Sequence, residues 1–158
     1  MAKEITKKTA TVKAKVAKVE KSVSEFSGEY FYAVGKRKTS VAQVRIYPTK
    51  KAETKVIVNG KDLKIFFPLK RLQDVVVAPF ISCGQEGKFD LSVKVNGGGV
   101  NSQAEASRLG VARAIIIFDL ALRKSLKAVG YLTRDARKVE RKKPGKRKAR
   151  RSPQWAKR

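Results

Sequence analysis

Histidine is absent from this 158-residue chain, and cysteine occurs only once, as Cys83. The absence of histidine removes the commonest general base and metal ligand of enzymes. A single cysteine excludes an intramolecular disulfide, which fits a reducing compartment. Because no histidine is present to activate its thiol, we expect Cys83 to be a buried or half-buried small residue rather than a nucleophile. We therefore expect no enzyme activity, no catalytic residue, no metal and no cofactor.

Long apolar runs are missing as well. No run approaches the length of a membrane span, and the Lys-rich N-terminus lacks the apolar core of a secretory signal. Residues 1–28 are rich in Lys, Ser and Thr, but they contain Glu4, Glu20 and Glu25 and no Arg. We therefore favour a disordered, Lys-rich extension of a mature bacterial-type protein over an organellar transit peptide. The expected location is the cytoplasm, without membrane contact.

Acidic residues are scarce: 13 Asp and Glu stand against 38 Lys and Arg, which gives a formal net charge of +25. Residues 1–28 contribute +4 (seven Lys, three Glu) and residues 29–133 contribute +10 (eighteen basic, eight acidic). The rest lies in residues 134–158. Self-repulsion of this size exceeds the needs of solubility. It predicts a polyanionic partner that is met on more than one side, and folded nucleic acid is the densest polyanion in a cell.

The strongest indication comes from residues 134–158, which we name the tail. It holds thirteen Lys or Arg against two acids, a net charge of +11. Like charges repel, and too little apolar surface is available to offset chain entropy, so the tail cannot collapse on itself. Pro144 and Gly145 interrupt any helix, and we predict an extended segment that is disordered in the free protein and ordered on nucleic acid. We expect Trp155 to stack on a base or fill an RNA or protein crevice; folding back onto its own domain is the alternative.

Residues 29–133 show strand and helix patterns. In Ser40–Tyr47 and Lys88–Asn96 apolar and polar residues alternate with period two, which predicts half-buried strands. Two further strands are expected, one from Tyr30 to Val34 that is interrupted at Gly35–Thr39 and one at Val56–Val58 before an Asn59-Gly60 turn. We also expect a helical turn at Leu63–Phe67 and a helix at Leu69–Ala78 that closes before Pro79. A long helix follows, with Ser102 as N-cap, Glu105 completing a capping box and Gly130 as C-cap. These patterns predict an α+β fold in which helices cover one face of a single sheet. The other face, with Gln43, Arg45, Ser92 and Lys94, is polar and is a candidate RNA surface.

Two loops are candidate phosphate sites. Lys36, Arg37 and Lys38 form a block in which three cations face one phosphate path. The run Gly97–Gly99 precedes the long helix, and a glycine-rich turn at a helix N-terminus binds anions in principle. A small phosphotransferase would fit such a turn, but the chain has no Walker pattern and no acid that stands out as a base or metal ligand. The three glycines therefore indicate tight strand-to-helix packing or a seat for an RNA phosphate.

Several of these segments together resemble one family, that of the ninth protein of the small ribosomal subunit. The matching segments are, in order, Tyr32–Ala42, Gly97–Gly99, Gln103-Ala104, Arg108–Ala114, Leu132–Asp135, Arg137, Val139–Lys143 and Lys148–Arg158. They run from about residue 30 to the end of the chain, and residues 1–28 are not covered. A series of this length in one order is a specific signature.

The resemblance implies a four- to five-stranded sheet with two helices on one face, like the second domain of ribosomal protein five, with a left-handed βαβ crossover. It implies three segments: an N-terminal extension (1–28), a globular rRNA-binding core (29–133) and a tail (134–158) that reaches the P site. The implied protein is a structural constituent of the small ribosomal subunit that acts in translation. It is a monomer within the ribosome, bound to small-subunit rRNA in the head beside other head proteins and to P-site tRNA.

Position by position, the resemblance makes Lys157 and Arg158 the expected tRNA-binding residues. Charge pattern and resemblance together give the expected rRNA-binding residues: Lys36, Arg37, Lys38, Arg141, Lys142, Lys143, Lys146, Arg147, Lys148, Arg150, Arg151 and Trp155. Trp155 stands where the family usually has Phe, which preserves stacking, and Ala156 where it usually has Ser, which removes a hydroxyl. The alternative function is that of a nucleoid-associated, DNA-binding architectural protein. Such proteins usually carry paired arms or wedge residues, and nothing in this chain indicates them.

Overall fold

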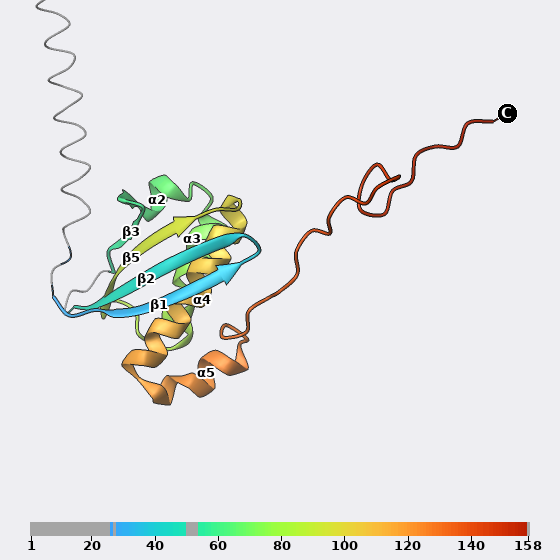
Figure 1. Ribbon diagram of the computed structural model, residues 1–158. Coiled ribbons are helices and arrows are strands. Elements are labelled where there is room, and N and C mark those ends of the chain that lie inside the picture. Colours follow the sequence, from blue (N-terminus) through green and yellow to red (C-terminus); the bar gives the residue numbers. More distant parts are fainter. Residues whose placement is uncertain (1–25, 27, 50–53, 158) are drawn as a thin grey trace, which may run out of the picture.

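Five strands form one mixed sheet in the computed structural model, which describes residue 26 and residues 28–49 and 54–157 (Figure 1). The strands are β1 (Phe31–Arg37), β2 (Ser40–Pro48), β3 (Val56–Val58), β4 (Lys61–Asp62) and β5 (Phe89–Asn96), in the order β1-β2-β5-β3-β4. The helices are α2 (Leu63–Phe66), α3 (Lys70–Ser82), α4 (Val100–Phe118), the 3₁₀ helix η1 (Leu120–Leu122) and α5 (Arg123–Ala128). The predicted α+β class with one sheet is confirmed. The predicted extension at residues 1–28 lies almost wholly outside the described residues.

Every second residue of the central strands enters the core. The buried positions are Ala42, Val44 and Ile46 on β2, opposite Val95, Val93 and Leu91 on β5. The alternation that the sequence predicted for both strands is thus confirmed. One polar position departs from the alternation predicted for Lys88–Asn96: Asp90 falls on the polar side of that pattern, but it is only 5% exposed. Its Oδ1 accepts the backbone N–H of Lys55 at 2.9 Å, which satisfies the carboxylate inside the fold.

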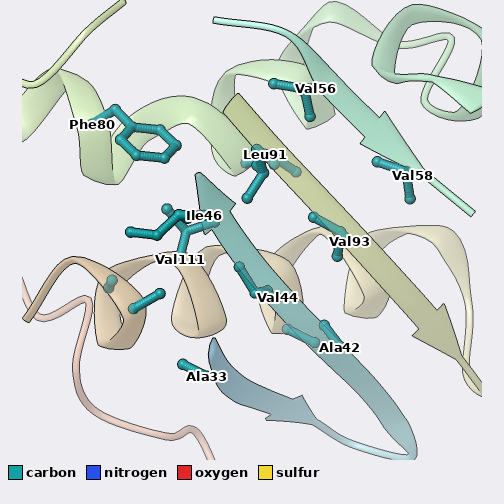
Figure 2. Close-up of a cluster of buried hydrophobic side chains, with 14 of the residues drawn as sticks. Ala33, Ala42, Val44, Ile46, Val56, Val58, Phe80, Leu91, Val93 and Val111 are labelled. Atoms are coloured by element: carbon teal, nitrogen blue, oxygen red, sulfur yellow. The ribbon is translucent and has the colours of Figure 1, made fainter. Parts of the chain in front are cut away.

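Helices α3 and α4 cover one face of the sheet (Figure 1). Apolar side chains from both helices complete a single core with the strands. Figure 2 shows Phe80 of α3 and Val111 of α4 close to Ile46 and Leu91 of the sheet. Burial of this kind contributes roughly 25 cal/mol per Å² of apolar surface, so the shared core holds sheet and helices together. The prediction of two covering helices is confirmed.

The hairpin between β1 and β2 is tighter than predicted. β1 continues through Gly35 to Arg37, and only Lys38 and Thr39 form the turn. Two-residue hairpin turns favour positive φ, and Lys38 has a φ of +52°. The predicted interruption at Gly35 is wrong because this glycine serves the packing of β1 on α4. A Cβ there would collide with the carbonyl oxygen of Ala106 on α4.

β1 is the edge strand on the α4 side of the sheet. One of its backbone carbonyl groups is nevertheless occupied, because Arg113 of α4 donates from Nη1 to the oxygen of Val34 at 2.9 Å. Arg113 therefore ties the strand edge to the helix that supports it.

Helix α3 does not end where the sequence predicted. It continues through Pro79 to Ser82, whereas we expected it to close at Ala78. Proline removes one helical hydrogen bond. Both Pro79 and Phe80 are buried, however, and the ring of Phe80 stacks on that of Phe89 with centroids 5.9 Å apart. Burial of the last turn outweighs the missing bond and keeps the helix intact.

Helix α4 is shorter than predicted at its C-terminal end, and its N-cap is Gly99 instead of Ser102. Ser102 still serves the helix start, since its hydroxyl accepts the Gly99 N–H at 3.1 Å. The helix ends at Phe118 because Asp119 is extended, with φ −141°, and caps η1. Gly130 follows α5 instead, with φ +83°. Within the described ranges, no helix combines the length and apolarity that a membrane crossing requires.

The parallel pair β3 and β5 is connected through α3, which forms a βαβ unit. β4 was not predicted; its two residues pair with β3 across the Asn59-Gly60 turn. Both turn residues have positive φ, 49° and 75°, as the Asn-Gly pair indicates. The left hand of the crossover and the likeness to ribosomal protein five stay predictions of the resemblance.

Candidate nucleic-acid interface

The tail departs from the globular core as an extended segment (Figure 1). Between Arg134 and Lys157 it forms neither helix nor strand, and nearly every side chain is exposed. It turns at Pro144-Gly145, where Gly145 has a φ of +71°. Trp155 is 91% exposed and does not fold back onto the core, which was its alternative role. The described tail thus presents its cations to the surroundings instead of to the rest of the chain.

Eight tail cations were expected at rRNA, and all are exposed: Arg141, Lys142, Lys143, Lys146, Arg147, Lys148, Arg150 and Arg151. Arg150 has an acidic partner, since it donates from Nε and Nη2 to Glu140 at 3.1 and 2.7 Å. These hydrogen bonds lower the pKa of Glu140. Exposed ion pairs are weak, so a phosphate can compete for Arg150. Of the two expected tRNA-binding residues, Lys157 is exposed and Arg158 lies outside the described residues.

The cationic block at residues 36–38 is divided between the two sides of β1. Lys36 and Lys38 are exposed, on the strand and in the turn respectively. Arg37 points toward α4, and its side chain is only 13% exposed. The expectation that all three cations face one phosphate path is wrong, because successive residues of a strand point to opposite sides. Contact of Lys36 and Lys38 with rRNA stays a prediction, whereas Arg37 turns its guanidinium toward partners within the protein.

Four charged residues join β1, α4 and the start of the tail, and we name this cluster the tail anchor: Arg37, Glu105, Asp135 and Arg137. Arg37 Nε donates to Glu105 Oε2 at 2.5 Å, and Arg37 Nη2 pairs with Asp135 Oδ2 at 2.9 Å. Arg37 Nη1 donates to the backbone oxygens of Asp135 and Arg137 at 3.4 and 3.1 Å. All three nitrogens of the Arg37 guanidinium therefore have partners within the protein.

Arg137 completes the cluster from the tail side. It reaches Asp135 Oδ2 from Nη2 at 2.8 Å and both carboxylate oxygens from Nε at 3.1 Å. Hydrogen bonds from Arg137, followed by the charges of Arg137 and Arg37, hold the pKa of Asp135 well below its usual range. Sequence analysis missed this cluster, since Arg37 is 98 residues from Asp135. The sequence did offer one indication of it: Asp135 is one of only two acids in the tail, and an acid among so many cations suggests an ion pair.

The face of the sheet away from α3 and α4, here called the open face, combines cations with aromatic rings. The polar residues predicted for it are exposed or half-buried: Gln43, Arg45, Ser92 and Lys94. The guanidinium of Arg45 lies over the ring of Tyr30, 5.2 Å from its centroid. The ring of Tyr47 stacks with that of Phe26, with centroids 5.2 Å apart. Cations beside rings suit both phosphates and bases. The aromatic part was missed because Phe26 lies in the segment predicted as a disordered extension, and because the placement of Tyr30 beside Arg45 depends on the fold.

The glycine loop before α4 is explained by packing. Gly97 and Gly98 have φ of +71° and +64°, which side chains rarely adopt. A Cβ at Gly98 would collide with the hydroxyl of buried Ser40, which hydrogen-bonds the Ser102 hydroxyl at 2.7 Å. These residues fix β2 against the start of α4. A cavity of about 520 Å³ beside the loop is lined in part by Lys38; binding of an RNA phosphate there stays a prediction.

The remaining candidate for chemistry is Cys83, which is half-buried as predicted. Burial raises the pKa of its thiol, which favours the unreactive protonated form. Across the part of the chain that the structure describes, no group of three or more His, Cys, Asp or Glu residues could hold a metal ion.

A small α+β core with a cationic tail longer than any of its helices defines a class: basic proteins that assemble with structured RNA, as ribosomal proteins do. Comparison with known proteins gives the family. Residues 35–158 match the model of the family described as ribosomal protein S9/S16. A curated relative, small ribosomal subunit protein uS9 of Lawsonia intracellularis (strain PHE/MN1-00), is 46% identical over 132 residues, which cover 84% of this chain and 99% of that protein. The chain belongs to the ribosomal protein S9/S16 family.

Family membership confirms the resemblance drawn from the sequence motifs. It leaves the nucleoid-associated alternative without support. The matched region includes the hairpin cations, α4, the tail anchor and the tail, while residues 1–34 precede it.

Proposed function

We propose that the chain is a structural constituent of the small ribosomal subunit, which binds small-subunit rRNA in the head and contacts P-site tRNA through the end of its tail during translation. The observation that carries the proposal is the tail, an exposed segment of net charge +11 that stands clear of the core. Such a segment gains stable contacts only where phosphates are dense. Membership in the ribosomal protein S9/S16 family supports ribosomal RNA as that polyanion.

In this proposal rRNA meets the protein on two sides. The tail cations from Arg141 to Arg151 neutralise phosphates along an extended path, and their Arg guanidiniums add bidentate contacts. Lys36 and Lys38 contact the backbone at the hairpin. The open face supplies a second surface, where Arg45 and Lys94 bind phosphates and the rings around Tyr30 receive unstacked bases. Other proteins of the subunit head complete the surroundings.

The end of the tail carries the tRNA contact. Lys157 and Arg158 place two cations at the terminus, which suits the phosphates of an anticodon stem-loop. Trp155 lies two residues before them and has no partner in the core, which leaves its ring to stack in an RNA crevice. The usual Ser hydroxyl is missing at Ala156, so any contact made by that hydroxyl in relatives is absent here.

Sedimentation of a tagged full-length chain tests the proposal. Lysate is fractionated at moderate salt, and the chain is expected to travel with small subunits and with the 70S particle. RNase treatment before centrifugation should release it, whereas DNase should not. Sedimentation with chromosomal DNA, abolished by DNase, would overturn the proposal.

A further inference from the structure

Arg37 occupies an unusual position for a residue in a cationic block. Two residues before it on the same side of β1, Gly35 lies so close to α4 that a Cβ would come within 2.5 Å of the Gly110 backbone nitrogen. This contact brings the end of β1 onto the first half of α4. Arg37 therefore meets Glu105, the residue directly before Ala106 of the same contact, at 2.5 Å. The packing of the β1 backbone on α4 thus orients the Arg37 guanidinium away from solvent.

The first residues of the tail contact the Arg37 guanidinium. Asp135 pairs with Arg37 through its carboxylate at 2.9 Å, and the backbone oxygens of Asp135 and Arg137 accept bonds from Nη1. Both backbone and side-chain atoms of the tail are thus held by one residue of the sheet. Arg137, whose side chain is 87% exposed, also pairs with Asp135, and this exposed pair adds less than the contacts of Arg37 do.

From this geometry we infer that Arg37 is a positioning residue that anchors the tail to the core through Glu105 and Asp135, and that it does not contact rRNA phosphate. The role of this anchor rests on the proposed function, because the anchor would set the point from which the tail enters the RNA. A segment fixed at its root loses less conformational entropy on binding than one that swings freely. The neighbouring cations Lys36 and Lys38 remain available for phosphates.

The anchoring itself is tested in the free full-length protein. Spin labels are placed at Asn101 of α4 and Lys138 of the tail, both replaced by Cys in a Cys83→Ser background, and their distance distribution is measured. A narrow distribution is expected for the parent and for the matched control Lys38→Gln. Arg37→Gln and Asp135→Asn should both broaden it. Asp135→Asn leaves β1 and α4 unchanged, so it tests the anchor even where Arg37→Gln fails to fold.

The salt dependence of rRNA binding separates an anchor from a phosphate contact. Loss of one phosphate contact lowers the slope of log K against log salt concentration by roughly 0.7 to 0.9. Lys38→Gln should show this change, while Arg37→Gln should keep the parent slope. An unchanged distance distribution in Arg37→Gln and Asp135→Asn, or a reduced slope in Arg37→Gln, would overturn the inference. The distance measurement needs no ribosome, so its failure is distinct from failure of the proposed function.

Discussion

The backbones of Gly35 and Gly110 approach each other closely, with β1 lying on α4 at a point where both elements carry a glycine. A Cβ at Gly35 would meet main-chain atoms of Ala106 and Gly110, and a Cβ at Gly110 would lie 2.5 Å from Cγ2 of Val44. The obstacle at Gly35 is helix backbone, whereas the nearest obstacle at Gly110 is a side chain, with the Gly35 backbone nitrogen further off at 3.2 Å. A side chain can shift, and a helix backbone cannot do so cheaply. This contact sets the distance between the sheet and its longest helix.

Replacement of either glycine by Ala should therefore destabilise the fold, and the loss of stability should be larger at Gly35 than at Gly110. We expect Gly35→Ala to lower the free energy of unfolding by about 2 to 3 kcal/mol, as overpacking against a fixed neighbour does. Gly110→Ala should cost less, because Val44 can adjust and Ala favours helix by about 1 kcal/mol. Urea unfolding followed by circular dichroism measures both.

Gly99→Ser is the matched control for this series. No atom lies within 4 Å of a Cβ at Gly99, its φ is −107°, and Ser is a favourable N-cap. We expect unchanged or slightly raised stability. Equal stability of all three variants would show that the close approach of β1 and α4 is not tight in solution.

The ion pairs of Asp135 should survive unusually acidic conditions. The folded-state pKa of this carboxyl is lowered, mainly by its hydrogen bonds from Arg137. The pairing is therefore fully formed above the ordinary carboxyl pKa of about 4, and it is lost only as the pH falls through the lowered value. NMR titration of the Asp135 carboxyl carbon should show no protonation at pH 4. In Arg137→Gln its pKa should rise toward the ordinary range; no change there would remove Arg137 as the chief cause.

Deletion of Lys157 and Arg158 should separate assembly from tRNA binding. The two residues are a small part of the tail charge, so variant subunits should form in normal yield. Dissociation of P-site tRNA from purified variant ribosomes is expected to be several-fold faster. The control Lys61→Gln/Lys64→Gln removes the same charge from exposed positions on the core. Identical tRNA dissociation in the deletion and control ribosomes would refute a P-site contact by the terminus.

Substitution of Trp155 should affect binding and leave the isolated fold unchanged. The ring is 91% exposed, so Trp155→Ala should change the unfolding free energy by no more than about 0.5 kcal/mol. Loss of a stacked base should weaken binding to the assembled subunit by about 1 to 3 kcal/mol. Trp155→Phe keeps a stacking ring and should retain most of the affinity. Comparable affinity for the Ala and Phe variants would rule out stacking.

Much of the fold followed from local patterns. The strands Ser40–Tyr47 and Lys88–Asn96 were predictable because alternate burial leaves its period in the sequence. The Asn59-Gly60 turn was predictable because its backbone angles select those residues. The continuation of α3 through Pro79 was not, since it depends on the packing of Phe80 against Phe89, nine residues further along the chain.

The candidate interface divides in the same way. Exposure of the tail follows from its composition, because a segment with so much like charge cannot bury itself. The direction of the Arg37 side chain depends on which side of β1 it lies and on the contact of Gly35 with α4. Its partner on that helix, Glu105, is 68 residues further along the chain. A count of cations treats Arg37, Lys36 and Lys38 alike; only the fold separates the one that faces inward from the two that face outward.

The hydrogen bond from Arg113 to Val34 matters for the protein before it meets RNA. An uncovered outer strand can recruit a second copy and start the growth of a continuous sheet, which leads to aggregates. Because the Val34 oxygen already accepts a hydrogen bond from Arg113, an incoming strand could not use it as an acceptor for strand pairing. The guanidinium of Arg113 also places a positive charge there, which repels another copy of so basic a chain. Both effects disfavour edge-to-edge pairing of two free chains at β1.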